Sequence, residues 1–218
     1  MVSLGPGDVE LLTYKALEVF KEVDVICVPT KSEDKSFKKS ISYKIVQEAL
    51  GILGIKKEII AVYAPMRFKK EDWVEEAKTV LEAFKSAKKV AFVTLGDAGF
   101  YSSVYYILDI IKAIDYEVYD SCEIIAGVTS FSAASAKIKK PLCLGDERVF
   151  IEPLNPRTEP KTTHILMRPK INQDTSSLGE GDFYTFENLF LDDEKITPKK
   201  ISKVKKYMTL FINFAKRF

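Results

Sequence analysis

One stretch of the chain, residues 90–103, constrains the fold more than any other. Val90-Ala91-Phe92-Val93-Thr94-Leu95 is an apolar run rich in β-branched residues, and it leads directly into Gly96 and Asp97. Such a run, ending at a glycine loop, is typical of a buried parallel strand. Ligands of open α/β sheets bind beyond the carboxyl ends of such strands. Because Gly96 and Gly99 carry no Cβ, a ligand can approach the backbone here. We therefore expect the loop to hold a small-molecule cofactor, with Asp97 placing a carboxylate beside it.

Strand-like and helix-like patterns alternate through the first two thirds of the chain. Further strands are predicted at Met1–Leu4, Val23–Pro29, Glu58–Ala64 and Glu123–Ile125. Helices are predicted from an Asp8 cap through Phe20 and at Tyr43–Leu53, Glu71–Lys85, Val104–Ala113 and Ala133–Ala136. We interpret Trp73 as a core residue of its helix rather than as a stacking surface. This alternation specifies a parallel sheet with helices on both faces.

The pattern changes near Pro141, where a Pro-rich polar stretch begins to separate strand-like runs. Strands are predicted at Arg148–Leu154, Ile165–Met167, Phe183–Phe190 and Tyr207–Phe214, with one short helix at Lys199–Lys206. We therefore predict two domains, an α/β domain over residues 1–140 and a smaller mixed α/β domain over residues 141–218.

Composition excludes several classes of function. The net charge of +2 argues against a nucleic-acid-binding protein. No apolar run approaches the roughly 20 residues of a membrane span, and the first residues read as a strand rather than as a signal peptide. Three widely spaced cysteines favour a reducing, cytoplasmic environment. They lack zinc-ligand spacing and the chain has one histidine, His164, so no metal site is expected.

Two further loops have the composition of ligand-binding turns. Gly5-Pro6-Gly7-Asp8 joins a strand to a helix without matching the G-x-G-x-x-G dinucleotide pattern, so a nicotinamide-dependent dehydrogenase is a poor interpretation. Gly127-Val128-Thr129-Ser130 precedes a helix of small residues, where hydroxyl groups either cap the helix or bind a ligand. Local sequence leaves both possibilities open for both loops.

Taken together, three motifs resemble the tetrapyrrole methylase family, the class III S-adenosylmethionine-dependent methyltransferases. They are Gly5-Pro6-Gly7-Asp8, Thr94-Leu95-Gly96-Asp97 with Phe100-Tyr101-Ser102, and Gly127-Val128-Thr129-Ser130-Phe131-Ser132-Ala133. The resemblance covers roughly residues 2–155 and is strongest to the precorrin-2 C(20)-methyltransferases, including those that act on cobalt-factor II. It implies a two-domain α/β fold and a homodimer, with S-adenosyl-L-methionine between the domains and a tetrapyrrole substrate over the first domain's strand ends.

The resemblance also assigns site residues by position. The expected cofactor-binding residues are Pro6, Asp97, Phe100, Thr129, Ser130 and Met167. Because the tetrapyrrole bears many carboxylates, the candidate substrate-binding residues are mainly cationic: Lys31, Lys35, Arg67 and Arg168, together with Asp8. The sequence departs from the family pattern at Ser3, at Ala98-Gly99 and at Ala126, and the region after Lys170 is short.

The implied reaction is a displacement of a methyl group from a sulfonium by a nucleophilic ring carbon. It requires alignment and exclusion of water rather than a catalytic triad or a metal, and the sequence names no proton-removing residue. The alternatives are methylation at another ring position, a uroporphyrinogen methylase, a diphthine synthase, or a catalytically impaired dimer subunit that binds ligand.

Overall fold

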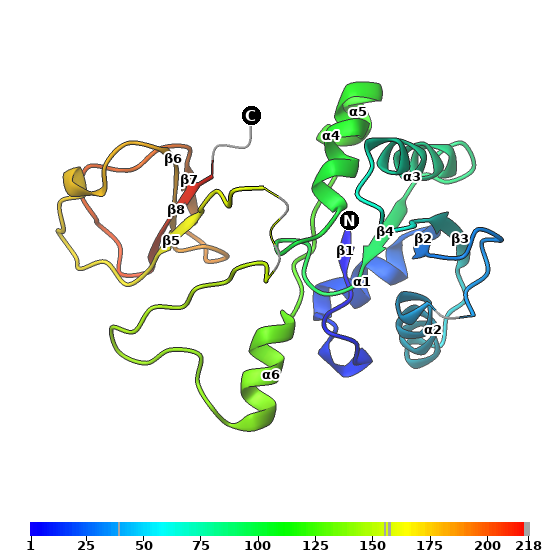
Figure 1. Cartoon of the computed structure of the whole chain (residues 1–218), viewed down its shortest axis with the longest axis horizontal. Coiled ribbons are helices and arrows are strands. Elements are labelled where there is room, and N and C mark those ends of the chain that lie inside the picture. The colour runs from blue at the N-terminus through cyan, green and yellow to red at the C-terminus, as the bar shows by residue number, and fades with distance from the viewer. Residues whose placement is uncertain (39, 155, 157, 216–218) are drawn as a thin grey trace. The chain divides into compact units, whose positions relative to one another are not determined.

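The chain forms two compact units, Met1–Val149 and Phe150–Phe218. A computed structural model describes residues 1–38, 40–154, 156 and 158–215 (Figure 1). The sequence analysis places the boundary after residue 140. Between there and residue 163 the described residues form neither helix nor strand, and the two units divide within this irregular segment.

The first unit contains a four-stranded sheet in which every strand pair is parallel. Its order is β1-β4-β2-β3, and the strands are β1 (Val2–Ser3), β2 (Val25–Thr30), β3 (Glu58–Tyr63) and β4 (Val90–Thr94). Parallel strands end at one edge of their sheet, so the loops that follow them start from the same edge. The predicted parallel sheet is therefore confirmed.

Helices cover both faces of this sheet, because successive side chains of a strand point to opposite sides. On β2, Ile26 and Val28 pack with α1 (Tyr14–Glu22) and α2 (Ile41–Leu53). Val25 and Cys27 point the other way, toward α3 (Lys70–Ala83) and α4 (Val104–Ile114). Figure 1 shows α3 and α4 above the sheet and α1 and α2 below it. Burial on both faces explains why the strands read as continuous apolar runs.

The helix predicted to begin at Asp8 begins later. The Asp8 carboxylate does cap a turn, accepting a hydrogen bond of 3.0 Å from the backbone N–H of Glu10, but this turn is the 3₁₀ helix η1 (Val9–Leu11). Thr13 then caps α1 by accepting a hydrogen bond from the N–H of Ala16. The apolar periodicity runs through both η1 and α1, which is why the sequence analysis predicted one continuous helix.

The end of the first unit also differs from the sequence prediction. The strand expected at Glu123–Ile125 is wrong, because in the described chain Ile125 alone pairs, in an isolated bridge with Val2. A short helix that the sequence pattern missed, α5 (Tyr116–Asp120), lies before it. The small-residue helix α6 (Ser130–Ile138) follows, longer than predicted.

The second unit is built on a four-stranded antiparallel sheet. Its order is β5-β8-β6-β7, formed by β5 (His164–Leu166), β6 (Asp182–Glu187), β7 (Lys195–Thr197) and β8 (Thr209–Phe214). One 3₁₀ helix, η2 (Ser176–Leu178), accompanies it, and Phe183, Val204 and Phe211 form a small core. The predicted two-domain α/β fold is thus confirmed, with an all-antiparallel sheet in the second unit.

Two elements predicted in this region are wrong. The helix expected at Lys199–Lys206 does not form, because the backbone there pairs instead with residues 172–175, through bonds such as Val204 N–H to Gln173 O (3.0 Å). The strand expected at Arg148–Leu154 does not form either. Its described residues are exposed and belong to no strand.

Glu76, on the second turn of α3, is a buried carboxyl group with an unusual environment. Only 4% of the residue is exposed, and its Oε2 atom has no hydrogen-bond partner in the described part of the chain. Burial, aided by the negative charge of Asp72, raises the pKa of Glu76 to about 7 from its ordinary 4.5. The folded protein therefore binds this proton more tightly than the unfolded chain does.

We expect this group to make the fold less stable as the pH rises. The folded-state pKa is the higher one, so the loss begins above pH 4.5 and is complete above about pH 7. The free energy of unfolding should decline by about 3 kcal/mol between pH 4.5 and pH 8 relative to a Glu76→Gln variant. Urea unfolding of both proteins across this range measures the difference. Parallel pH profiles would contradict the assignment.

Candidate functional site

The first of the three glycine loops, residues 5–8, is a tight turn at the carboxyl end of β1. Gly5 and Gly7 have φ values of 69° and 128°, a region that residues with a Cβ seldom adopt. Pro6 lies between them and is half-buried. The turn therefore holds Pro6 in a defined position at the sheet edge.

The second loop, which follows β4, is hydrogen-bonded directly to the first. The N–H of Gly5 donates to the carbonyl oxygen of Gly96 at 3.0 Å, and the N–H of Gly96 donates to the carbonyl oxygen of Gly5 at 2.8 Å. This pair of bonds extends the β1–β4 pairing beyond the strands themselves. Two segments about ninety residues apart in sequence are thereby fixed to each other.

Ser3 adds a side-chain bond between these loops. It is fully buried, and its Oγ accepts a hydrogen bond of 2.9 Å from the N–H of Ala98. An unpaired buried N–H is costly, so this hydroxyl stabilises the loop conformation. Sequence reasoning noted Ser3 only as a departure from the family pattern. The missed signal was a small polar residue at the end of an otherwise apolar strand.

Asp97 connects the second loop to the third. Its Oδ1 accepts hydrogen bonds from the N–H of Gly99 and from the N–H of Gly127, both at 3.2 Å. Gly127 lies so close to the other two loops that an ideal Cβ would come within 2.6 Å of Ser3 Cβ and 2.9 Å of Gly96 O. All three loops therefore meet at one edge of the sheet.

The remaining predicted cofactor residues of the first unit lie on the third loop and beside it. Thr129 is the N-cap of α6, where its hydroxyl accepts a bond from the N–H of Ser132. Ser130 is the exposed first residue of that helix. Phe100 contacts Phe131 edge to face, with ring centroids 5.2 Å apart. The structure thus assigns Thr129 a capping role and leaves the hydroxyl of Ser130 exposed.

Ser102 ties the second loop to the helix that follows it. Its Oγ lies 3.1 Å from the hydroxyl of Thr94, at the end of β4, and accepts a bond from the N–H of Val104. The first turn of α4 is consequently fixed relative to the strand end.

The remaining predicted binding residues come from several separate segments of the chain. Lys31 and Lys35 are exposed in the segment after β2, and the Asp8 carboxylate caps η1. Met167 and Arg168 belong to the second unit, directly after β5. Their roles in binding stay predictions.

Arg67 is engaged by a carboxylate of its own chain. Its Nη2 lies 2.6 Å from Asp72 Oδ1, and its Nε donates to Asp72 Oδ2 at 3.2 Å. This two-pronged pairing lowers the pKa of the Asp72 carboxyl and raises that of the guanidinium. Arg67 therefore holds the turn before α3 against the first turn of that helix.

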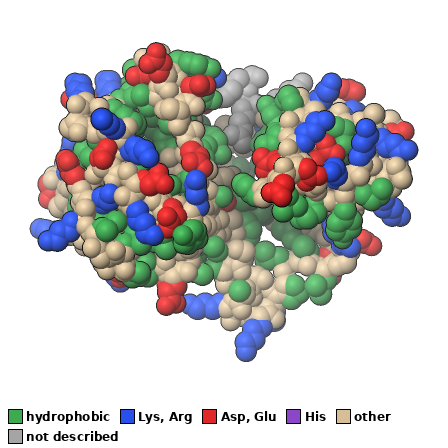
Figure 2. Space-filling model, turned by 180° about the vertical axis from the view of Figure 1, so that it is seen from behind, with side chains coloured by type: hydrophobic (Ala, Val, Ile, Leu, Met, Phe, Trp, Pro, Cys, Tyr) green, Lys and Arg blue, Asp and Glu red, His purple; other side chains and the backbone are tan. Residues whose placement is uncertain are grey.

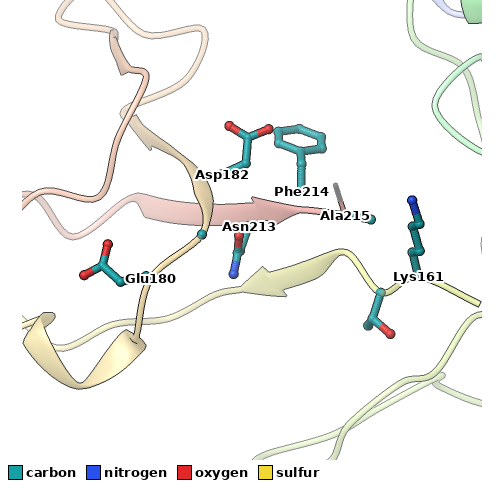
Figure 3. A pocket seen from close by; sticks show the side chains of 8 residues that line it. Lys161, Glu180, Asp182, Asn213, Phe214 and Ala215 are labelled. Carbon is teal, nitrogen blue, oxygen red and sulfur yellow. The ribbon is translucent and has the colours of Figure 1, made fainter. Parts of the chain in front are cut away.

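The second unit carries an open hollow of about 400 Å³ (Figure 3). It is lined by Lys161, Thr162, Glu180, Gly181, Asp182, Asn213, Phe214 and Ala215. Asn213 lies over Gly181, and an ideal Cβ built on Gly181 would fall 2.2 Å from Oδ1 of Asn213. The hollow contains no residue that the sequence analysis singled out.

Charged side chains of both signs are mixed on the surface of the protein (Figure 2). Lys, Arg, Asp and Glu side chains are interspersed over the face shown in Figure 2, as expected for a net charge of +2. In the described residues, no group of three or more His, Cys, Asp or Glu side chains is placed to hold a metal ion. Among the helices of the described chain, none has both the length and the apolar character of a membrane span.

A parallel α/β unit with three interlocked glycine loops at its strand ends, followed by an antiparallel unit, defines a class of protein. A sequence model of the family "Tetrapyrrole (Corrin/Porphyrin) Methylases" matches residues 1–181. The chain therefore belongs to the tetrapyrrole methylases, as the three motifs predicted.

Within this family, the chain is similar to proteins named as C(20)-methyltransferases. The chain is 32% identical over 211 residues to a probable cobalt-precorrin-2 C(20)-methyltransferase of Methanocaldococcus jannaschii, covering 93% of this chain and 87% of the relative. It is 30% identical over 147 residues to the cobalt-precorrin-2 C(20)-methyltransferase of Salmonella typhimurium, covering 66% and 57%. Among solved structures, a putative cobalamin synthesis related protein (CobF) from Corynebacterium diphtheriae has the same fold, with a TM-score of 0.54, 14% identity and coverage of 97% and 95%.

We expect Gly127→Ala to destabilise the first unit, because its new Cβ would overlap Ser3 and the backbone of Gly96. Overpacking of this kind costs about 1–3 kcal/mol. Gly51→Ala is the matched control. Gly51 lies within α2, where an added Cβ meets nothing within 4 Å, so this change should stabilise the protein by up to about 1 kcal/mol. Urea unfolding of both variants measures the contrast, and equal effects would disprove the close contact.

Proposed function

We propose that this protein transfers a methyl group from S-adenosyl-L-methionine to C-20 of precorrin-2 or cobalt-factor II, in the biosynthesis of cobalamin. The observation that carries the proposal is the convergence of the three family motifs, hydrogen-bonded to one another, at the carboxyl edge of the parallel sheet. The similarity to a relative named for this reaction, along nearly the whole chain, supports the choice of acceptor. Cobalt, where present, belongs to the substrate.

The loops suit a nucleoside cofactor for two reasons. Ideal Cβ atoms built on Gly7 and Gly96 meet no atom within 4 Å, so the space above both backbones is open to a ligand. Within the described chain, Asp97 uses Oδ1 for its two bonds to the loops, and no such bond occupies Oδ2. We expect this second oxygen to accept a hydrogen bond from a ligand hydroxyl.

When bound, S-adenosyl-L-methionine supplies an electrophilic methyl group on a sulfonium leaving group. The loop residues of this chain contribute position. Asp97 and the backbone of the three loops orient the cofactor, with Pro6 and Phe100 supplying apolar contact and Ser130 a hydroxyl. Because bonds between the loops hold them before any ligand arrives, little conformational entropy is lost when the reactants are aligned.

The reaction itself provides the direct test. We expect incubation of the protein with S-adenosyl-L-methionine and cobalt-factor II, or metal-free precorrin-2, to yield S-adenosyl-L-homocysteine and a product in which a methyl group has replaced a proton, heavier by one CH₂ unit. Mass spectrometry detects the product, and NMR of the isolated product locates the new methyl group. Methylation at another carbon would refute the C-20 assignment, and binding without turnover would indicate a catalytically impaired subunit.

Asp97→Asn tests the cofactor site itself. The amide keeps an acceptor oxygen for Gly99 and Gly127 but loses the charge, so we expect S-adenosyl-L-homocysteine to bind about tenfold more weakly with little change in stability. Asp24→Asn is the matched control. The Asp24 carboxylate also accepts two backbone N–H bonds, from Lys88 and Lys89, but it lies at the opposite end of the sheet. Calorimetric titration should find wild-type affinity in the control. Unchanged affinity of Asp97→Asn would remove Asp97 from the site.

A further inference from the structure

An aromatic group lies beside the second loop, on the first turns of α3 and α4. Trp73 and Tyr106 stack face to face, with ring centroids 4.0 Å apart and planes within 3° of parallel. Phe68, in the turn before α3, meets Trp73 nearly at right angles, with centroids 6.2 Å apart. The two helices are in contact (Figure 1). We refer to Phe68, Trp73 and Tyr106 as the aromatic platform.

The platform presents ring surface to solvent. Trp73 is half-buried and packs against the core beneath α3 and α4, whereas Tyr106 is 44% exposed and Phe68 50% exposed. Trp73 covers one face of the Tyr106 ring, and nearly half of the surface of Tyr106 is exposed. Another flat ring could continue the stack there.

The turn that displays Phe68 is held in an unusual conformation. Met66 and Phe68 both have positive φ values, 59° and 56°, which are uncommon for bulky residues. The paired bonds from Arg67 to Asp72 fasten the turn to α3. Strained backbone conformations persist only where the surrounding structure enforces them. In this turn, the strained conformation keeps the ring of Phe68 at the surface.

The charges around the platform suit an anionic ligand. Lys69 and Lys70 are exposed next to Phe68, whereas Glu71 and Asp109, three residues after Tyr106 on α4, are exposed carboxylates. The carboxylate of Asp72 is paired with Arg67, so it does not repel an anion strongly. A flat, apolar surface beside exposed ammonium groups is complementary to a conjugated macrocycle with carboxylate substituents.

The platform also adjoins the proposed cofactor loops. α3 begins after β3 and α4 after β4, so both first turns lie at the carboxyl edge of the sheet. The Ser102 bonds to Thr94 and Val104 connect the second loop to the turn that carries Tyr106. A ligand on the platform would thus lie on the same edge as a cofactor held by the three loops.

We propose that the aromatic platform binds the face of the tetrapyrrole acceptor, by stacking on Tyr106 and contact with Phe68. This rests on the proposed function and assigns residues to its substrate side. Trp73 supports Tyr106 from below, and Arg67 acts as a positioning residue that keeps Phe68 in place.

The test compares binding of two ligands by variants of the full chain. We expect Tyr106→Ala and Phe68→Leu to weaken cobalt-factor II binding about 3- to 10-fold, as measured by absorbance titration of the tetrapyrrole. Their affinity for S-adenosyl-L-homocysteine, measured by calorimetry, should stay within about twofold of wild type, because the loops are untouched. Tyr106→Phe keeps the ring and should retain wild-type binding of both. Tyr14→Ala removes an exposed tyrosine of α1, on the other face of the sheet, and should also change neither.

The outcomes separate this inference from the proposed function. A wild-type protein that binds neither ligand would contradict the proposed function. A wild-type protein that binds both, with cobalt-factor II affinity unchanged in Tyr106→Ala and Phe68→Leu, would overturn the platform alone. A platform variant that alters the subunit composition in sedimentation, with tetrapyrrole affinity intact, would identify the surface as a contact between copies and likewise overturn it.

Discussion

The two hydrogen bonds between Gly5 and Gly96 are the contact on which the site depends. They bring together turns from distant parts of the chain, and Gly127 completes the arrangement because it has no Cβ to overlap Ser3 or the Gly96 carbonyl. These hydrogen bonds join backbone groups, so they do not depend on the side chains of neighbouring residues. Loops held in this way need little ordering when a ligand binds, which favours both affinity and alignment.

The loops start from a sheet that is packed on both faces. Helices bury both faces of β2 and β4, so each strand is fixed by packing on two sides as well as by its neighbours. The loops start where that packing ends. The Thr13 and Thr129 caps supply hydrogen bonds that the helix starts would otherwise lack. The scaffold therefore ties the positions of the loops to those of the strands.

Several charged side chains near this edge of the sheet form hydrogen bonds and ion pairs within the protein itself. Arg67 is committed to Asp72, and the Asp8 carboxylate to the N–H of Glu10. In the proposed reaction, recognition then depends on the Asp97 carboxylate, exposed backbone and aromatic rings, with Lys69 and Lys70 at the margin. This division suits a substrate that is flat and apolar at its centre and anionic at its periphery.

The sequence by itself determined the parallel sheet and its two helical layers, because apolar runs and periodicities record local geometry, and the resemblance of its three motifs indicated the family. The three motifs also identified the loops, including Asp97 and Gly127. Only the tertiary structure decided what those residues touch: the Asp97 bond to Gly127, the Ser3 bond to Ala98, and the commitment of Arg67 to Asp72. It also decided against a helix at Lys199–Lys206, where backbone pairing with residues 172–175 overrode local propensity. Helical spacing predicted Trp73 to be a core residue rather than a stacking surface; it is half-buried and packs against the core, but it also stacks on another ring. Its stacking on Tyr106 was not predicted, since the ring that covers it belongs to another helix and no local pattern records such a contact.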